Sequence, residues 1–92
     1  MSANKFLIKI KLNPETLIAQ VAVDDFTYQV EVDKEYASWV DFDPKKTEAM
    51  IKWSFDFLLQ KESPKAILAK FKLSEINSYF PNYYSLIREV FC

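Results

Sequence analysis

Carboxylates are the side chains of this sequence whose spacing could support chemistry. Asp24 and Asp25 are adjacent, Asp33 follows, and Asp41 and Asp43 are separated by one residue. Paired carboxylates can bind Mg²⁺ or Ca²⁺, or divide acid and base roles when their pKa values differ. A calcium loop of the EF-hand kind also needs a central glycine, which this chain lacks. We favour the structural interpretation, in which Asp33 and Asp43 cap helices and Asp24-Asp25 forms a turn.

Two residue types that catalytic sites often use are missing from the composition. The 92 residues include no glycine and no histidine, although glycine averages about 7 % of protein sequences. Phosphate-binding loops need glycine because the backbone must approach the ligand without a Cβ, so Walker-type and dinucleotide-type loops are excluded. Histidine is the commonest general base and metal ligand. We therefore expect no enzyme, no catalytic residue, no metal site and no small-molecule cofactor.

Lysines interleaved with aromatic residues in the C-terminal third could bind single-stranded nucleic acid through phosphate contacts and base stacking. Acidic neighbours dilute this charge, and the single arginine, Arg88, lies far from it in the sequence. Aromatic residues at helical spacing more often belong to a core, and the lysines then form the solvated face. A nucleic-acid-binding accessory protein is the alternative function. Its candidate contacts are Lys61, Lys65, Lys70, Lys72, Tyr83 and Tyr84.

Two other groups of side chains favour contact with a protein. The first strand carries alternating lysines, which protect a sheet edge against unwanted pairing, and such an edge could also accept a partner strand or a second copy. Aromatic residues between positions 39 and 53 exceed what a short helical segment covers. The leading hypothesis is a non-enzymatic protein-interaction domain: an adaptor, inhibitor or subunit that could form a homodimer. Its candidate contacts are Lys5, Lys9, Lys11, Trp39, Phe42 and Trp53.

The first third of the chain has the period-two pattern of strands. Apolar residues alternate with polar ones over about 5–12, 17–23 and 26–32, which predicts a three-stranded antiparallel meander with one apolar face. Asp24-Asp25 is expected to form a tight hairpin turn, because Asp tolerates left-handed backbone when Gly is absent. In a competing interpretation, Asn13 caps a helix that begins at Pro14, so residues 14–20 are either strand or helix.

The remainder of the chain predicts helices that cover the apolar face of the sheet, giving an α+β fold. Asp43-Pro44 and Ser63-Pro64 each place a capping side chain before a proline, the residue whose missing N–H costs nothing at a helix start. Tyr83 or Tyr84 is expected to face inward near the C-terminus. The predicted helices span about 34–40, 44–60, 64–71, 74–80 and 82–91.

Length and composition favour one globular domain over residues 1–92. Half of the residues are apolar and 16 % are aromatic, which is enough to fill a core. The net charge of −1 argues against a binder of bulk polyanions. The single cysteine, Cys92, gives no internal disulfide, and no apolar run approaches the length of a membrane span. We therefore expect a cytoplasmic protein that makes no membrane contact.

A series of short motifs covers about the central two-thirds of the chain. These motifs resemble those of a small family of uncharacterised bacterial α+β proteins with no assigned activity. The family pattern has Asp-Gly at the hairpin where this chain has Asp24-Asp25, which implies a more strained or longer turn here. The resemblance implies a fold and no site residue. It rests on Val23-Asp24-Asp25, Tyr28-Gln29-Val30-Glu31-Val32, Ser54-Phe55-Asp56-Phe57-Leu58-Leu59, Ala66-Ile67-Leu68, Phe71-Lys72-Leu73-Ser74-Glu75-Ile76 and Tyr79-Phe80-Pro81-Asn82-Tyr83.

Overall fold

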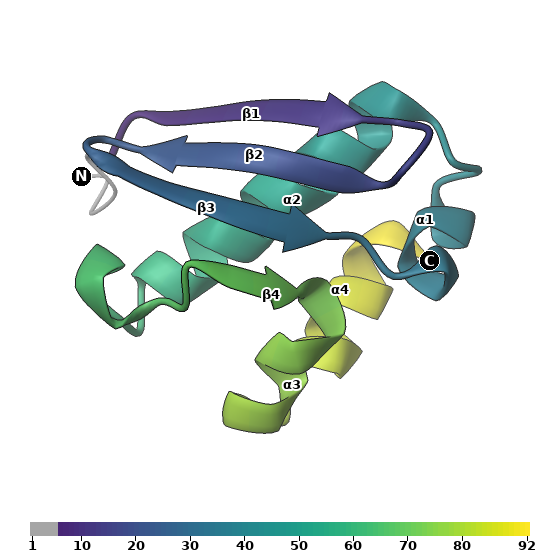
Figure 1. Cartoon of the computed structure of the whole chain (residues 1–92). Coiled ribbons are helices and arrows are strands. Elements are labelled where there is room, and N and C mark those ends of the chain that lie inside the picture. The colour runs from purple at the N-terminus through teal and green to yellow at the C-terminus, as the bar shows by residue number, and fades with distance from the viewer. Residues whose placement is uncertain (1–5) are drawn as a thin grey trace.

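A four-stranded sheet carries the helices on one face, so the α+β class is confirmed (Figure 1). The computed structural model describes residues 6–92. The strand order is β1-β2-β3-β4; the first three strands form the predicted antiparallel meander, and the fourth pairs parallel with β3. The strands are β1 (Ile8–Asn13), β2 (Ile18–Val23), β3 (Phe26–Glu31) and β4 (Lys70–Lys72).

The connection between β1 and β2 is one turn that resembles the start of a helix without continuing as one. The Asn13 side-chain oxygen accepts a hydrogen bond from the backbone N–H of Glu15 at 3.0 Å, and the N–H of Leu17 donates to the Asn13 carbonyl at 2.8 Å. Leu17 then takes a positive φ of 57°, which ends the turn. The strand begins at Ile18, so the interpretation of residues 14–20 as a helix is wrong.

The hairpin between β2 and β3 is tight, because Val23 pairs directly with Phe26 across two turn residues. Asp24 has a positive φ of 53°, in the region that glycine favours and that Asp tolerates better than most residues. Its carboxylate accepts a hydrogen bond from the backbone N–H of Leu7 at 2.9 Å. The Asp24 N–H donates to the Leu7 carbonyl at 3.0 Å. The turn is therefore not longer than Asp-Gly would make it, and its first residue also holds the start of β1.

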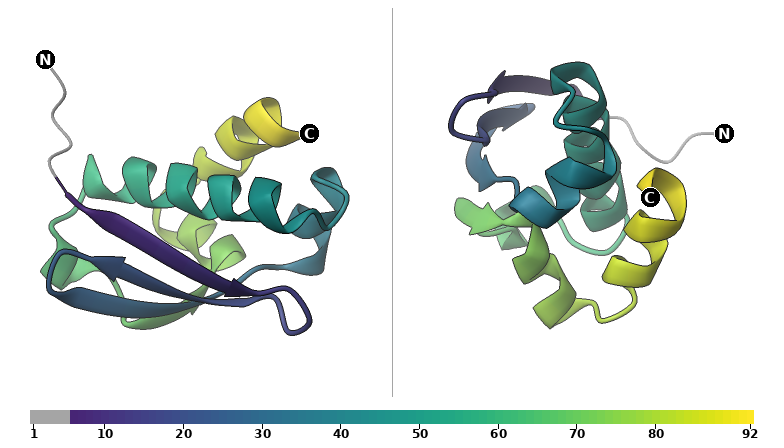
Figure 2. Two further views of the ribbon diagram at one scale, coloured as in Figure 1. Left: turned by 90° about the horizontal axis from the view of Figure 1, so that it is seen from above. Right: turned by 90° about the vertical axis from the view of Figure 1, so that its right-hand side faces the viewer.

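The helices cover the apolar face of the sheet, with α2 lying along it (Figure 2). The Asp43 carboxylate caps α2 by accepting a hydrogen bond from the Lys46 N–H at 2.9 Å, as the Asp43-Pro44 signature predicts. None of the helices within residues 6–92 combines the length and the apolar character that crossing a membrane requires. The α-helices are α1 (Lys34–Trp39), α2 (Pro44–Leu59), α3 (Ile76–Tyr79) and α4 (Tyr83–Phe91); two short 3₁₀ turns are η1 (Pro64–Ala66) and η2 (Leu73–Glu75).

The predicted helix over 64–71 is wrong in its detail, because this segment holds η1 and then β4. This segment pairs with the edge of β3 that β2 leaves open. The N–H of Gln29 donates to the Ala69 carbonyl at 2.8 Å, and the Tyr28 hydroxyl donates to the Pro64 carbonyl at 2.6 Å. Phe71 is buried between two exposed lysines, as a strand requires. The segment predicted as a helix over 74–80 is similarly split into η2 and α3.

The core lies between the sheet and α2. Val21 and Val30 point inward from neighbouring strands, and Met50, Ile51 and Phe55 of α2 meet them with 0 or 1 % of their surface exposed. Burial of such side chains is the main favourable contribution to the folding free energy. The opposite face of the sheet carries no helix in the described part of the chain, so its side chains face solvent (Figure 2).

Candidate functional site

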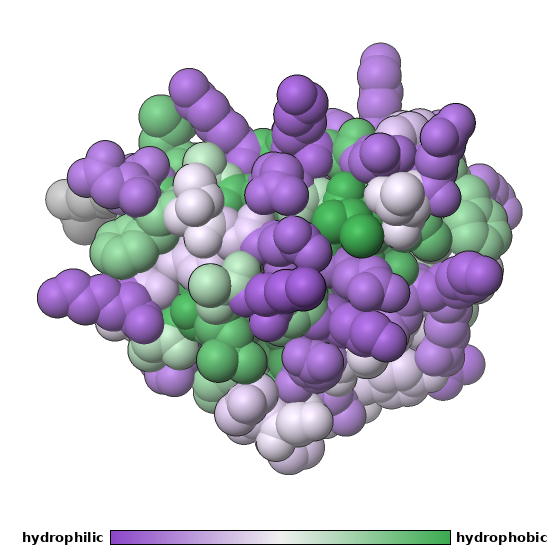
Figure 3. Space-filling view, in the orientation of Figure 1, coloured by the Kyte–Doolittle hydropathy of each residue, from purple (hydrophilic) through white to green (hydrophobic). Residues whose placement is uncertain are grey.

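Four lysines from the two ends of the chain share the uncovered face of the sheet. Lys9 and Lys11 lie on β1, exposed between half-buried apolar residues, as predicted. The strand register continues from Lys11 through two glutamines to Lys70 on β4, and it pairs Lys72 with Glu31. Figure 3 shows this face, where hydrophilic side chains project along the β1 side and hydrophobic residues are interspersed. The predicted contact Lys5 lies outside the described residues.

The aromatic residues predicted to contact a protein are mostly packed against other rings. Trp39 stacks on Tyr36 with ring centroids 4.6 Å apart, and Trp53 stacks on Phe57 at 5.8 Å. Both indoles are half-buried, so packing accounts for much of their surface. Phe42 differs, because 51 % of its surface is exposed at a turn residue with a positive φ of 55°. Of these three aromatic residues, Phe42 offers the most open ring.

The two tyrosines predicted to stack on nucleic acid bases belong to the interior cluster. Tyr83 is fully buried and shares a hydrogen bond of 2.8 Å with the Ser54 hydroxyl; burial raises the pKa of Tyr83 far above its ordinary value. Tyr84 is half-buried, and its hydroxyl donates to Glu35 Oε2 at 2.7 Å. This hydrogen bond to the protonated form raises the pKa of Tyr84. Tyr83 has no accessible face for a base.

Of the other predicted basic residues, Lys61 packs at the edge of that cluster and Lys65 lies elsewhere. The ammonium of Lys61 lies over the ring of Phe57 at 5.0 Å and near that of Phe80 at 5.8 Å, which is the geometry of a cation–π contact. Lys65 is exposed on η1. Since Tyr83 is buried and Lys70 belongs to the uncovered sheet face, the structure does not bring the predicted nucleic-acid contacts to one surface.

Three of the acidic residues, Asp24, Asp33 and Asp43, accept hydrogen bonds at separate places. Asp24 and Asp43 bond the backbone as described above, while Asp33 bonds Ser74 with both carboxylate oxygens, at 3.0 Å to its N–H and 2.7 Å to its hydroxyl. The prediction that Asp33 caps α1 is therefore wrong, because its side chain makes no bond to that helix. Within residues 6–92 no group of three or more acidic, histidine or cysteine side chains is placed to hold a metal ion.

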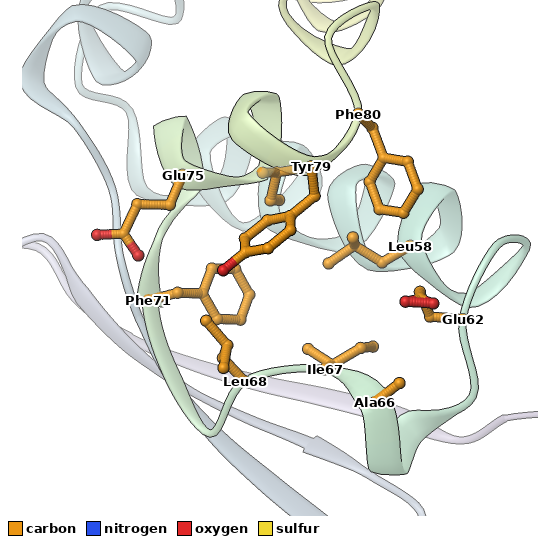
Figure 4. Close-up of a pocket in the computed structure, with 10 residues that line it drawn as sticks. Leu58, Glu62, Ala66, Ile67, Leu68, Phe71, Glu75, Tyr79 and Phe80 are labelled. Carbon is orange, nitrogen blue, oxygen red and sulfur yellow. The ribbon is translucent and has the colours of Figure 1, made fainter.

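An apolar pocket of about 140 Å³ lies between the end of α2 and the segment from η1 to α3 (Figure 4). Leu58, Phe71 and Ile76 form its buried floor. Two side chains at its rim are unusually exposed for their size: Leu68 keeps 50 % of its surface in solvent and Tyr79 keeps 65 %. The remaining lining residues are Glu62, Ala66, Ile67, Glu75 and Phe80. We call this hollow the 58–80 pocket.

The 58–80 pocket is an apolar receptor whose charged lining residues are both acidic. The charged groups among its lining residues are the carboxylates of Glu62 and Glu75. In Figure 4 the Glu75 carboxylate points away from the hollow, while the Tyr79 ring lies across it toward Phe71 and Leu68. Lining of this kind excludes water from an apolar ligand group and supplies little else. It can hold a side chain, and it contains no pair of a nucleophile and a base.

The sequence interpretation missed this pocket because it placed Leu68 in a helix over 64–71. In the structure the helical turn η1 ends at Ala66 and β4 begins at Lys70, so Leu68 lies at the rim while Phe71 fills the floor. The available signal was the alternation Lys70-Phe71-Lys72, which has the period of a strand. Three residues are too few to establish that period from the sequence alone.

Comparison of the chain with protein-family models, with curated proteins and with solved structures finds no match. The resemblance to a family of uncharacterised bacterial proteins stays a prediction.

Proposed function

We propose that this chain is a non-enzymatic protein-interaction domain, and that the 58–80 pocket receives one apolar side chain of a partner protein. The observation that carries the proposal is the exposure of Leu68 and Tyr79 beside a buried apolar floor. Large apolar side chains leave water when a partner covers them, and binding free energy concentrates where an anchor residue fills such a pocket. The Glu62 carboxylate at the rim favours an anchor that is flanked by Lys or Arg.

The volume of the pocket supports a side chain as its occupant over a small molecule. Sites for drug-sized ligands and cofactors measure about 300–1,000 Å³. An apolar cavity of about 150 Å³ holds a benzene ring, and the 58–80 pocket has about 140 Å³. A leucine, methionine or phenylalanine side chain therefore matches the space, and a nucleotide or flavin exceeds it.

Site-specific crosslinking tests the proposal. A photo-reactive phenylalanine analogue replaces Leu68, and in a matched control it replaces Val90, which is similarly exposed on α4 and does not line the pocket. We expect one defined protein to be crosslinked from position 68 in cells of the source organism and not from position 90. The purified partner should then bind L68E about tenfold or more weakly than wild type, with V90E unchanged. Equal binding by both variants would refute the pocket as the contact.

A second candidate function, binding of single-stranded nucleic acid, is favoured by one observation. Among the paired strand residues that the structure describes, the uncovered face carries four lysines, Lys9, Lys11, Lys70 and Lys72, and one acidic residue, Glu31. Phosphate contacts from such a face would make binding strongly dependent on salt. Titration of a labelled single-stranded RNA at low and at physiological salt tests this function. K70A/K72A should lower the affinity and its dependence on salt. An affinity that changes neither with salt nor with K70A/K72A would rule the function out.

A further inference from the structure

The backbone of β1 presents unpaired hydrogen-bonding groups along the open edge of the sheet. The Leu7 carbonyl accepts from the Asp24 N–H, and this pair has the same register as the whole β1-β2 ladder. Hydrogen-bonded pairs alternate along antiparallel strands, so Lys9 and Lys11 bond β2 with their backbone groups. The N–H and C=O of Ile8, Ile10 and Leu12 then point away from β2. Within residues 6–92, β2 is the sole strand that pairs with β1.

This edge is also accessible in three dimensions. Figure 2 (left) views the molecule from the β1 side, and neither a helix nor a strand of the described chain crosses in front of β1. α2 runs beside β1 on the covered face. Ile8, Ile10 and Leu12 pack toward that face and remain half-buried, so an added strand would cover the part of them that is still exposed. β1 has six residues, which is a usual length for a strand and enough for a partner strand to pair with.

The side chains of β1 oppose pairing with a second copy. When two antiparallel strands continue one sheet, residues that stand opposite each other lie on the same face. In the two registers that overlap two β1 strands best, either Lys9 faces Lys11 of the second copy or Lys11 faces its own equivalent. Like charges directly opposite each other destabilise a strand pair. The lysines therefore discourage a homodimer through this edge, in keeping with the use of Lys on natural edge strands.

The same lysines fit a strand of the opposite charge. We propose that β1 pairs with an extended segment of a partner protein in which acidic residues alternate with apolar ones. The acidic residues would stand opposite Lys9 and Lys11 on the uncovered face, and the apolar residues would extend the row of Ile8, Ile10 and Leu12. This surface is separate from the 58–80 pocket, and the proposal does not depend on that pocket being occupied.

A peptide titration followed by amide NMR tests this pairing. The probe is a blocked synthetic peptide of about seven residues that alternates valine and glutamate, and the matched peptide alternates valine and lysine. We expect the glutamate peptide to slow hydrogen exchange at the amides of Ile8, Ile10 and Leu12, since those of Lys9 and Lys11 already bond β2. K9E/K11E should weaken its binding by about tenfold or more and reverse the preference between the peptides. K70E/K72E, on the other edge strand of the same face, should bind the peptide like wild type.

The charge-reversed variant K9E/K11E allows a second experiment, in which whole proteins take the place of peptides. In K9E/K11E the strand itself alternates apolar and acidic residues, so we expect it to associate with wild type in a mixture, while each protein alone does not associate through β1. Light scattering and the same three amides report the association. The proposal is overturned when neither the glutamate peptide nor K9E/K11E protects those amides. The proposal is also overturned if the peptide slows amide exchange around the lysines of all strands, because a polyanion bound to the whole face would give that result. L68E should leave the results of both experiments unchanged, which separates this test from that of the pocket.

Discussion

Ser74 donates two hydrogen bonds to Asp33, one from its backbone N–H at 3.0 Å and one from its hydroxyl at 2.7 Å. The two residues are 41 positions apart in the sequence. Asp33 follows β3, and Ser74 lies in η2 directly after β4. One carboxylate therefore ties the N-terminal meander to the C-terminal segment that builds the 58–80 pocket, at the end of the parallel pair β3-β4.

Loss of this carboxylate should destabilise the fold. Hydrogen bonds to charged groups contribute about 1.5–3 kcal/mol, so we expect D33A to lower the free energy of unfolding by about 2 kcal/mol. S74A removes one of the two bonds and should cost about half as much. Urea unfolding measures both, with S85A at an exposed serine of α4 as the matched control. A cost of S74A no greater than that of S85A would contradict the assigned role.

The buried pair Ser54 and Tyr83 should respond asymmetrically to substitution. The Ser54 hydroxyl also bonds the Met50 carbonyl at 2.9 Å, so Tyr83 is the donor to Ser54 when that bond is made. S54A leaves a buried tyrosine hydroxyl without a partner, which costs about 1–3 kcal/mol, while Y83F removes the hydroxyl itself and costs about 1 kcal/mol. We expect the double variant to be more stable than S54A alone. Additive costs in the double-mutant cycle would show that the bond does not couple the two residues.

Stability should fall at alkaline pH because of the buried tyrosines. Burial first, and the nearby charges of Asp33 and Glu35 second, raise the pKa of Tyr36 from its ordinary 10.0 to about 12. Above pH 10 the unfolded chain releases this proton while the folded protein retains it, so the free energy of unfolding declines until the pH passes the folded pKa. Tyr83 acts in the same direction.

Phenylalanine substitution isolates this contribution. Y36F cannot ionise at position 36, so its stability should decline less steeply than that of wild type between pH 10 and 12. Urea unfolding over this range measures the slope, and tyrosinate absorbance of the folded protein reports when ionisation begins. Parallel decline of Y36F and wild type would show that Tyr36 does not contribute.

The parts of the fold that could be predicted from the sequence are those set by neighbours along the chain. Alternation over six residues identifies β1, β2 and β3, and Asp43-Pro44 identifies the start of α2, because one strand face or one cap suffices to produce the pattern. Asp33 shows the limit. Its position before a helix suggests a cap, yet Ser74 offers two donors from a segment that the sequence does not place nearby.

The candidate sites depend on contacts between distant segments and were harder to predict. The exposure of Lys9 and Lys11 on β1 follows from alternation, whereas their shared face with Lys70 needs the parallel pairing of β4 with β3. The 58–80 pocket needs the same pairing, since it turns Leu68 outward. Helical spacing also could not distinguish Tyr83 from Tyr84 as the buried ring, because adjacent residues differ by only about 100° around a helix.

Substitutions at Leu68 and Phe71 test both the strand β4 and the availability of the pocket. In a helix over 64–71 both side chains would face inward and both truncations would be costly. In the structure Leu68 is half exposed and Phe71 is buried, so L68A should change the free energy of unfolding by no more than about 0.5 kcal/mol, while F71A should cost about 3–5 kcal/mol. Urea unfolding of the two variants measures the difference. A cost of L68A that approaches that of F71A would mean that Leu68 supports the core, and its side chain would then be unavailable to a partner.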